Sequence, residues 1–495
     1  MMIPGPPPEA TRRAQKKGQV DAAGVDAAAS QRGPAGAALG NNGVTATQQV
    51  TGLHARRRDR WSLTARLWEM SSLKAVRQCR KHLHFGNDEG VEVRRNSESA
   101  GFGGLMTCGS PWACPRCAAM VAVTRAEEIA RAVQHVNETG GQVAFLTFTM
   151  RHDRSHSLAD EWKALSAGWR AVFGGPAWLG RPARRNQAAK PGERDLRGIL
   201  GTVRTVEATH GENGWHLHVH ALVFASAGAF ADDDDLQSFG DRLHERWSRG
   251  VQNAGLPAPT RKHGTDVRLV EDGGAAFVGS YLNKTVSDSS MKAGLEAAAG
   301  GLKKGRKGNR APFQILRDAL EAEDHATRYR WYARRDWERV TLADGTEAMV
   351  VNDEDSDDFG TVYPIDEKTG LAHKPASRDF ALWHEWEKAS KGRRQILWSQ
   401  RIAEPKTDRE VAWNEVLDAR GEEVDDEEIA AETMEGKTAA IIDRLDWLRR
   451  MCAKPSLIYG LLEAVEAVPP DEATAAACSY GETHGLTIRP PGSSP

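Results

Sequence analysis

The segment His216-Leu-His-Val-His220, in which imidazoles alternate with apolar residues, has the clearest chemical content in this chain. Side chains on a β-strand alternate between its two faces. His216, His218 and His220 therefore share one face of a predicted strand, and the apolar residues between them anchor the other face in a core. Three imidazoles on one face indicate a platform for a divalent metal or for phosphate chemistry. The alternative is a set of three unrelated, partly buried histidines.

A carboxylate on the preceding segment extends this set. Residues 202–209 are β-branched and alternating, residues 210–214 have turn chemistry, and residues 215–224 form a return strand, so the sequence predicts a β-hairpin. Glu207 on the first strand would complete a site of two imidazoles and one carboxylate. Such sites serve non-haem iron oxygenases, or hold a divalent metal that polarises a phosphate. A register slip of one residue would turn Glu207 to the other face, as a solvated strand-end residue, so the sequence leaves its direction open.

A tyrosine on a later predicted helix is the candidate nucleophile. Tyr281 lies in Phe277-Val-Gly-Ser-Tyr-Leu-Asn-Lys284, and Lys284 follows it by one helical turn on the same face. A phenol has a pKa near ~10, so it needs a base, a cation or a metal-activated substrate to attack a phosphate. Lys284 is placed to lower that pKa or to hold the phosphate. Tyr329 and Tyr332 are rival nucleophiles, and ordinary helix packing of Tyr281 is the structural alternative.

Three segments in this order resemble the motifs of HUH-type endonucleases, especially rolling-circle replication initiators from plasmids of high-GC Gram-positive bacteria. They are Phe145–His152, Gly214–Val223 and Tyr281–Lys284, and the segments Cys108–Cys117 and Gly392–Trp398 also resemble parts of that plasmid family. The match covers residues from about 75 to 400.

The resemblance implies roles for particular residues. His218 and His220 would bind Mg²⁺ or Mn²⁺, with His216 as a flanking third histidine. Tyr281 would attack one strand at the plasmid origin, become linked to the 5′ phosphate and release a 3′-OH primer. Some relatives carry a glutamate just before the tyrosine, for a second cleavage at termination, but Phe277 and Ser280 occupy the neighbouring positions here. Termination would then need a second protomer, water or a distant acid such as Glu271.

Four of the six cysteines cluster in the N-terminal part of the chain. Cys114 and Cys117 form a C-x₂-C pair, which is a common half-site for tetrahedral zinc, and Cys108 precedes this pair. The candidates for a fourth ligand are Cys79, His82 and His84. We favour a structural zinc that staples a loop to the following helix, and reduced thiols or a redox motif are the alternatives. Cys452 and Cys478 are interpreted as ordinary core or surface residues.

Two basic groups are candidate DNA contacts. Lys303, Lys304, Arg306, Lys307 and Arg310 lie on a Gly-rich loop. Such a loop can follow a phosphate backbone, with binding that weakens as salt rises. Arg393 and Arg394, together with Trp386 and Trp398, suggest a platform for stacking and phosphate contacts. A solvated loop and core tryptophans are the respective alternatives.

Interspersed strands and helices predict an α+β fold, with an HUH-type core of a central antiparallel sheet flanked by helices. The predicted parts are a disordered basic tail (1–60), a Cys-rich segment (61–125), a nuclease domain (126–340), an acidic mobile insert (341–375) and a helical C-terminal region (376–495). The net charge of −2 is unevenly distributed. From residue 404 onward the chain has 9 Lys and Arg but 20 Asp and Glu. The residues before 404 include 57 Lys and Arg and 48 Asp and Glu. A basic body with an acidic end indicates polyanion partners.

Composition excludes several classes of protein. No run of 18 apolar residues is present, and the first residues lack the apolar core of a signal peptide, so we expect a cytoplasmic protein without a membrane partner. The expected partner is plasmid origin DNA, double-stranded and single-stranded, with a host helicase as a candidate for the acidic region. The oligomeric state stays open. The alternatives are a relaxase or single-tyrosine transposase with the same chemistry, or a non-enzymatic, zinc-containing DNA-binding regulator. An iron oxygenase is disfavoured because no segment suggests a pocket for an organic cosubstrate.

Overall fold

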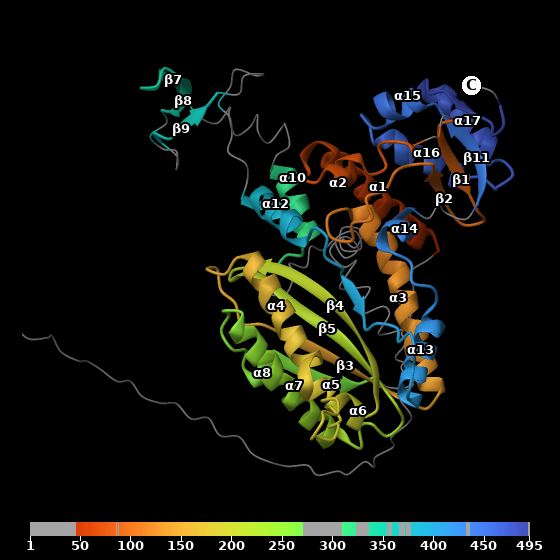
Figure 1. Cartoon of the computed structure of the whole chain (residues 1–495). Helices are drawn as coiled ribbons and strands as arrows, with labels where there is room; N and C mark the ends of the chain where they lie inside the picture. Colours follow the sequence, from red (N-terminus) through yellow and green to blue (C-terminus); the bar gives the residue numbers. More distant parts are fainter. Residues whose placement is uncertain are drawn as a thin grey trace, which may run out of the picture. The chain divides into compact units, whose positions relative to one another are not determined.

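The computed structural model describes residues 46–85, 87, 89–270, 309–322, 336–352, 354, 359–365, 372, 378–431 and 436–493. Within these ranges the strands form three antiparallel sheets of five, four and three strands, and helices pack on the two larger sheets (Figure 1). The predicted α+β class, with antiparallel sheets flanked by helices, is confirmed. No described helix is both long and apolar enough to cross a bilayer.

The five-stranded sheet carries the histidine segment. Its order is β10-β4-β5-β3-β6, with β3 at Gln142–Thr149, β4 at Ile199–Gly211, β5 at Gly214–Ala225, β6 at Thr265–Leu269 and β10 at Ile396–Trp398. Strands β4 and β5 pair along their whole length and are joined by a two-residue turn, which confirms the predicted hairpin. The long hairpin gives the site a rigid base, because each backbone group along it is paired with the neighbouring strand.

Helices cover both faces of this sheet. Helices α4 (Leu158–Phe173) and α7 (Asp233–Asn253) pack on one face, and α3 (Pro115–Glu138) and α13 (Asp408–Arg420) pack on the other (Figure 1). The alternation of β5 divides its residues between the two cores. Its odd-numbered apolar residues pack with α4 and α7, and Leu222 and Phe224 pack with α3 and α13. The histidines therefore lie on the α3 and α13 face, beyond the end of that apolar core.

The four-stranded sheet combines the two ends of the described chain. Its order is β12-β11-β1-β2, with β1 at Val91–Arg95, β2 at Ala100–Gly103, β11 at Lys437–Ile442 and β12 at Ile488–Arg489. Trp61, Phe102 and Trp447 pack edge to face in its core, with ring centroids 5.0–6.1 Å apart. The Cys-rich segment and the C-terminal region, which we predicted as separate parts, thus share one hydrophobic core.

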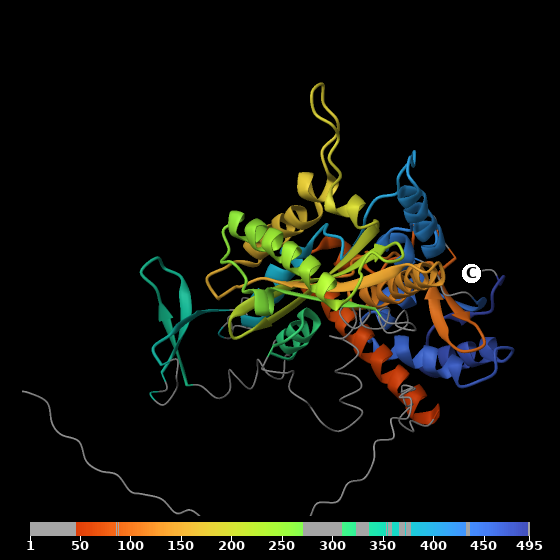
Figure 2. The same cartoon turned by 90° about the horizontal axis from the view of Figure 1, so that it is seen from below.

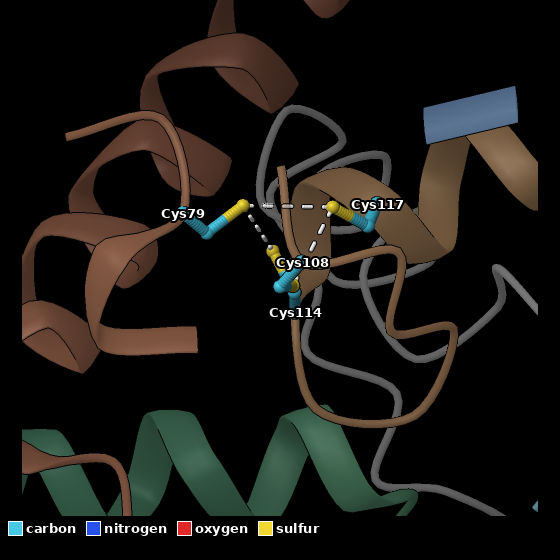
Figure 3. A group of neighbouring side chains, drawn as sticks. All are labelled: Cys79, Cys108, Cys114 and Cys117. Carbon is cyan, nitrogen blue, oxygen red and sulfur yellow. Dashed lines mark hydrogen bonds between the residues drawn. The ribbon is translucent and has the colours of Figure 1, made fainter. Parts of the chain in front are cut away.

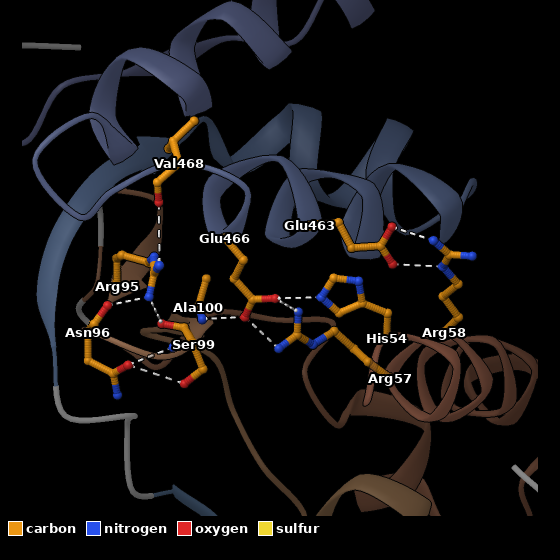
Figure 4. Close-up of polar contacts among 10 residues, drawn as sticks. All are labelled: His54, Arg57, Arg58, Arg95, Asn96, Ser99, Ala100, Glu463, Glu466 and Val468. Atoms are coloured by element: carbon orange, nitrogen blue, oxygen red, sulfur yellow. Dashed lines mark hydrogen bonds and ion pairs between the residues drawn. The ribbon is translucent and has the colours of Figure 1, made fainter. Parts of the chain in front are cut away.

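The predicted disordered tail was too long. Helix α1 (Ala46–Met70) begins well before residue 60, and its basic residues pair with helix α16 (Ser456–Glu466) (Figure 4). Arg57 makes two hydrogen bonds to Glu466, at 2.6 and 2.7 Å, and Arg58 pairs with Glu463 at 2.6 Å. The local sequence lacks apolar periodicity because this part of the helix is held by ion pairs to a distant acidic segment.

The predicted mobile insert contains a small sheet. Strands β7 (Trp337–Thr341), β8 (Glu347–Val351) and β9 (Val362–Pro364) form an antiparallel ribbon of their own (Figure 2). Met349 and Tyr363 lie in its small apolar core. The mobile insert was predicted from the acidic composition of residues 352–358. That composition gives no sign of the strands β8 and β9 on either side. The predicted boundary at residue 340 falls inside β7.

The remaining elements complete the description. They are α2 (Lys74–Gln78), α5 (Gly175–Leu179), α6 (Glu193–Leu196), α8 (Arg261–Gly264), α10 (Pro312–Ala322), α12 (Arg378–Ser390), α14 (Asp426–Ala431), α15 (Arg444–Asp446), a π-helical turn (Trp447–Met451) and α17 (Ala473–His484). The Trp-rich sequence over 379–399 favours a single helix, but the structure divides it. Helix α12 ends at Ser390, Gly392 takes a left-handed φ of 71°, and residues 396–398 form β10 beside β4.

Candidate functional site

The register of the β4–β5 hairpin answers the question that the sequence left open. Glu207 lies directly opposite His218, Thr205 opposite His220, and Thr209 opposite His216. Residues directly opposite each other on antiparallel strands share a face of the sheet. Glu207 therefore points to the same side as the histidines.

The carboxylate of Glu207 meets two of the three imidazoles. Its Oε2 atom lies 2.8 Å from Nε2 of His218 and 3.1 Å from Nε2 of His220. One ligand-type atom from each of these residues lies within 4.8 Å of the others. His216 is not in this group. Its ring makes edge contacts with His152 and His218, at centroid distances of 4.7 and 5.2 Å, so it flanks the site.

Strand β3 orients the innermost histidine. The Thr147 hydroxyl lies 3.1 Å from Nδ1 of His220, and the Phe145 ring stacks on the same imidazole at 5.6 Å between centroids. A partner on Nδ1 fixes the ring so that Nε2 faces Glu207, which is how second-layer groups orient metal-binding histidines. Thr147 was not among the residues predicted for this site. The alternation in Phe145-Leu-Thr-Phe-Thr149 was the available signal, because it places Thr147 on the histidine face.

The protonation states suit metal ligands. Burial alone raises the pKa of Glu207, but hydrogen bonds and charge from His218 and His220 outweigh it and hold that pKa well below its usual range. Burial lowers the pKa of His220 against the opposing effect of Glu207. The pKa of His216 falls to about 4, through burial first and then through the neighbouring histidines His218 and His152. The low pKa of Glu207 favours its ionised form, and an ionised carboxylate is the form that binds a cation.

The geometry fits a divalent ion. Ligands at right angles around Mg²⁺, at 2.0–2.1 Å from the ion, lie roughly 3 Å apart. The two distances from the Glu207 oxygen to the imidazole nitrogens match that separation. A mixed set of one oxygen and two nitrogens also suits Mn²⁺, which accepts both kinds of donor.

The second cluster brings together four cysteines (Figure 3). The Sγ atom of Cys79 lies 3.7 Å from that of Cys114 and 3.6 Å from that of Cys117, and Cys108 lies 3.6 Å from Cys117. All four are free thiols and lie within 4.8 Å of one another. Of the three candidates for the fourth position, Cys79 completes the group, whereas His82 and His84 are not part of it.

Several predicted functional residues lie outside the described residues. They are Tyr281, Lys284, Lys303, Lys304, Arg306 and Lys307, together with Glu271, Tyr329 and Tyr332. The nucleophile and most of the basic loop therefore stay predictions from the sequence.

The charge of Arg310 is paired with carboxylates of the protein itself. Its guanidinium lies between Asp318 and Asp379, at 2.6 Å from each, and these bonds raise its pKa. Its backbone also pairs with that of His210 in both directions, at 2.8 Å. Arg310 thus ties α10 and α12 to the end of β4, and its role as a DNA contact stays a prediction.

The proposed stacking platform is only partly supported. Trp386 is 1% exposed and stacks on Trp215 at 5.4 Å, so it is too buried to stack on a base. The guanidinium of Arg393 lies over the Trp162 ring at 4.7 Å. The side chain of Arg394 is 69% exposed, so it is more accessible to a phosphate than Arg393 is. Both arginines line a cavity of about 1360 Å³ whose wall also carries the acidic residues 425–428. This cavity is therefore not uniformly positive.

Glu161 is an unpredicted feature beneath the histidine strand. It lies on α4, is 0% exposed, and accepts a hydrogen bond from the Leu217 backbone N–H at 3.1 Å. Burial raises the pKa of Glu161 to about 8, opposed by the Leu217 N–H. The signal was present in the sequence, because Leu158, Glu161 and Leu165 have the spacing of one apolar helix face.

Comparison with known proteins gives two similar sequences. A protein named "Protein rep" from Streptomyces lividans is 30% identical over 328 residues, which cover 60% of this chain and 63% of that protein. A "Neomycin resistance protein" from Streptomyces cyanogenus is 29% identical over 235 residues, which cover 42% of this chain and 52% of that protein. The chain thus spans less than two thirds of either relative. No family model and no solved structure matches it.

Proposed function

We propose that this protein initiates plasmid replication by cutting one DNA strand at the origin through a tyrosine transesterification. The convergence of the Glu207 carboxylate with the Nε2 atoms of His218 and His220 carries the proposal. The order of the three sequence motifs and the similarity to a protein named rep support it.

The three residues of this group would hold Mg²⁺ or Mn²⁺. The bound ion would polarise the scissile phosphate and offset the charge that develops on it. Thr147 and Phe145 hold the His220 ring, and Glu207 supplies the negative charge that attracts a cation. The long hairpin keeps these groups in one geometry while DNA binds.

Tyr281 is the proposed nucleophile. Its phenol oxygen forms a bond to the scissile phosphorus as the bond from phosphorus to the 3′ oxygen breaks. The phenol loses its proton to a base or to solvent, and the departing oxygen gains one to become a 3′-OH. Lys284 would stabilise the phenolate or the phosphate. Because the phosphodiester energy is kept in the phosphotyrosine, attack by a 3′-OH can rejoin the strand.

The test uses the full chain, Mn²⁺ and single-stranded fragments that cover both strands of the plasmid carrying the gene. Fragments labelled at the 3′ end should give labelled protein that survives denaturation, and fragments labelled at the 5′ end should give a shorter product that a polymerase extends. Tyr281→Phe should abolish both products. Tyr329→Phe and Tyr332→Phe are matched controls and should retain them. Adduct formation by Tyr281→Phe would contradict the assignment of the nucleophile.

Metal dependence separates this proposal from a non-enzymatic regulator. A cleaving enzyme should lose nicking when Glu207→Gln is introduced, while it still binds the same DNA. Binding without cleavage by the unaltered protein, with Mg²⁺ and Mn²⁺ both tried on every plasmid fragment, would favour the regulator.

A further inference from the structure

We propose that Cys79, Cys108, Cys114 and Cys117 bind one zinc ion as thiolates, and that the guanidinium groups of Arg80 and Arg116 balance the charge of this site. The proposal is independent of the nickase function. It concerns what holds the N-terminal segment on the rest of the chain.

The sulfur positions fit a tetrahedron around one ion. Zinc–sulfur bonds of 2.3 Å place the sulfurs of a tetrahedral site about 3.8 Å apart. Three of the sulfur pairs here are 3.6–3.7 Å apart, and Figure 3 shows the thiols pointing toward a common centre. Sulfurs joined in a disulfide would be only about 2.05 Å apart.

The site is closed. Cys79, Cys114 and Cys117 are 0–1% exposed and pack with Val121 of α3 and with Ile429 of α14. Four protein ligands leave no position for water or substrate, and this is the pattern of a structural zinc site. The ligands come from the end of α2, from the loop after β2 and from the start of α3.

The neighbouring charges require a negative partner. Arg80 is 5% exposed, and its guanidinium donates to the Ala430 carbonyl and to the Met120 sulfur, both at 3.1 Å. The guanidinium of Arg116 lies over the Trp61 ring at 4.1 Å. The Nε atoms of both arginines are buried without a hydrogen-bond partner. Within the described part of the chain, neither has a carboxylate at ion-pair distance.

A zinc ion with four thiolates supplies the negative charge that the two guanidinium groups need. Buried charges are costly unless they are paired. Zn²⁺ with four thiolates carries a charge of −2, and the two guanidinium groups bring the assembly to neutrality. Four neutral thiols would leave both arginines uncompensated.

The backbone beside the first ligand adds a second, independent observation. Arg80 has a φ of 53°, and it is the one described non-glycine residue in the left-handed region. A side chain disfavours this conformation, and such residues gather at sites that clamp a ligand. The Arg80 N–H donates to the Met106 carbonyl at 2.6 Å, which holds the turn directly after Cys79.

Metal content is the first test. Full-length protein purified without added metal should contain one zinc per chain, and about four equivalents of an organomercurial should release it. Cys117→Ser should lose the zinc, whereas Cys478→Ser, at a half-buried position of α17, should keep it. Because Cys117→Ser can fail to fold, Co²⁺ exchange into the unaltered protein provides a second readout, and the expected result is the strong visible absorption of a tetrahedral cobalt thiolate. Absence of zinc, with all six thiols open to alkylation, would overturn the proposal.

The charge argument has its own test. Arg80→Met keeps the length of the side chain but removes its charge, so zinc affinity measured by chelator competition should fall roughly 10–100-fold. Arg77→Met is the matched control from the same segment, because its guanidinium bonds to the Ser71 carbonyl and not to the cluster. An unchanged affinity in Arg80→Met would refute the role of the arginine.

Discussion

At the scale of single residues, the candidate metal site depends on which histidines share an oxygen. His218 and His220 contact the same Glu207 atom, whereas the His216 ring contacts the imidazoles of His152 and His218. The three histidines are equivalent in the sequence pattern. The structure distinguishes them, because only two lie within reach of the carboxylate.

We expect His218→Ala to weaken Mn²⁺ binding by more than roughly 10-fold, because loss of a ligand costs at least as much as loss of an outer partner. His216→Ala should change the affinity far less, and it serves as the matched control. Isothermal titration with Mn²⁺ measures both. An equal loss in the two variants would mean that His216 is also a ligand.

The buried Glu161 should make stability depend on pH. Its folded pKa of about 8 exceeds the ordinary value of 4.5, so the folded state holds the proton more tightly. The resulting stabilisation is complete below about pH 4.5 and is lost as pH rises through 8. Glu161→Gln keeps an acceptor for Leu217 but cannot ionise, so from pH 5 to 8 it should gain about 2–4 kcal/mol in unfolding free energy relative to the unaltered protein.

Urea denaturation at pH 5 and at pH 8 measures this difference, and Glu245→Gln, at an exposed position of α7, is the control. A difference that does not change with pH would show that Glu161 ionises normally in the fold.

Sequence alone could identify the residues of the hairpin but not their partners. Alternation placed the three histidines on one face, and the C-x₂-C spacing indicated a cysteine cluster whose fourth member the sequence left open. The direction of Glu207 depended on a hairpin register, and the contact of Thr147 with His220 depended on which strand lies beside β5. Both are long-range pairings, which no local pattern encodes.

At the scale of elements, helix α1 is attached to α16 by two ion pairs of unequal burial. In the inner pair, Glu466 is 9% exposed and accepts hydrogen bonds from Arg57, His54 and the Ala100 N–H. In the outer pair, Glu463 contacts Arg58, whose side chain is 53% exposed. Exposed ion pairs contribute little to stability, and hydrogen bonds to partly buried charges contribute more. The inner pair should therefore do most of the attachment.

Glu466→Gln should lower the unfolding free energy by about 1.5–3 kcal/mol, since several bonds to a charged group are weakened together. Glu463→Gln, one turn away, should cost less than about 1 kcal/mol. Chemical denaturation followed by tryptophan fluorescence compares them. A larger effect at Glu463 would contradict the assigned burial.

Helix positions were largely predictable because their ends carry local signals. Ser157, Asp232 and Thr407 each accept a hydrogen bond from a backbone N–H in the first turn of the following helix. The sequence over 379–399 favours a longer helix than α12, because Trp398 in β10 continues the aromatic pattern past Gly392. Trp398 belongs to a sheet, and only the pairing of β10 with β4 reveals that.

At the scale of the whole molecule, the two ends of the described chain fold as one body. Strand β1 pairs with β11, and α16 packs beside β1 and β2. The C-terminal region is therefore part of the fold of the N-terminal segment. Composition alone divides the chain into separate parts. It does not reveal the pairing of β1 with β11, because these strands lie hundreds of residues apart in the sequence.

We expect a chain that ends at residue 403 to be poorly soluble, because it would expose the apolar core around Trp61 and Phe102. Co-expression with a fragment of residues 404–495 should restore solubility, and the two pieces should elute together in size-exclusion chromatography. A chain without the β7–β9 segment, residues 336–365, is the control and should remain soluble. A soluble, cooperatively folding 1–403 fragment would refute the shared core.

The pairing of β1 with β11 also sets the timing of folding on the ribosome. Strand β2 ends at Gly103 and β11 begins at Lys437, so 333 residues must be translated between them. At about 5–20 residues per second, the edge of β1 waits roughly 15–70 s for its neighbour. During that interval an unpaired strand edge is open to the nascent chains of adjacent ribosomes. Growth temperature and chaperone supply should therefore govern the yield of this protein more than the stability of the finished fold does.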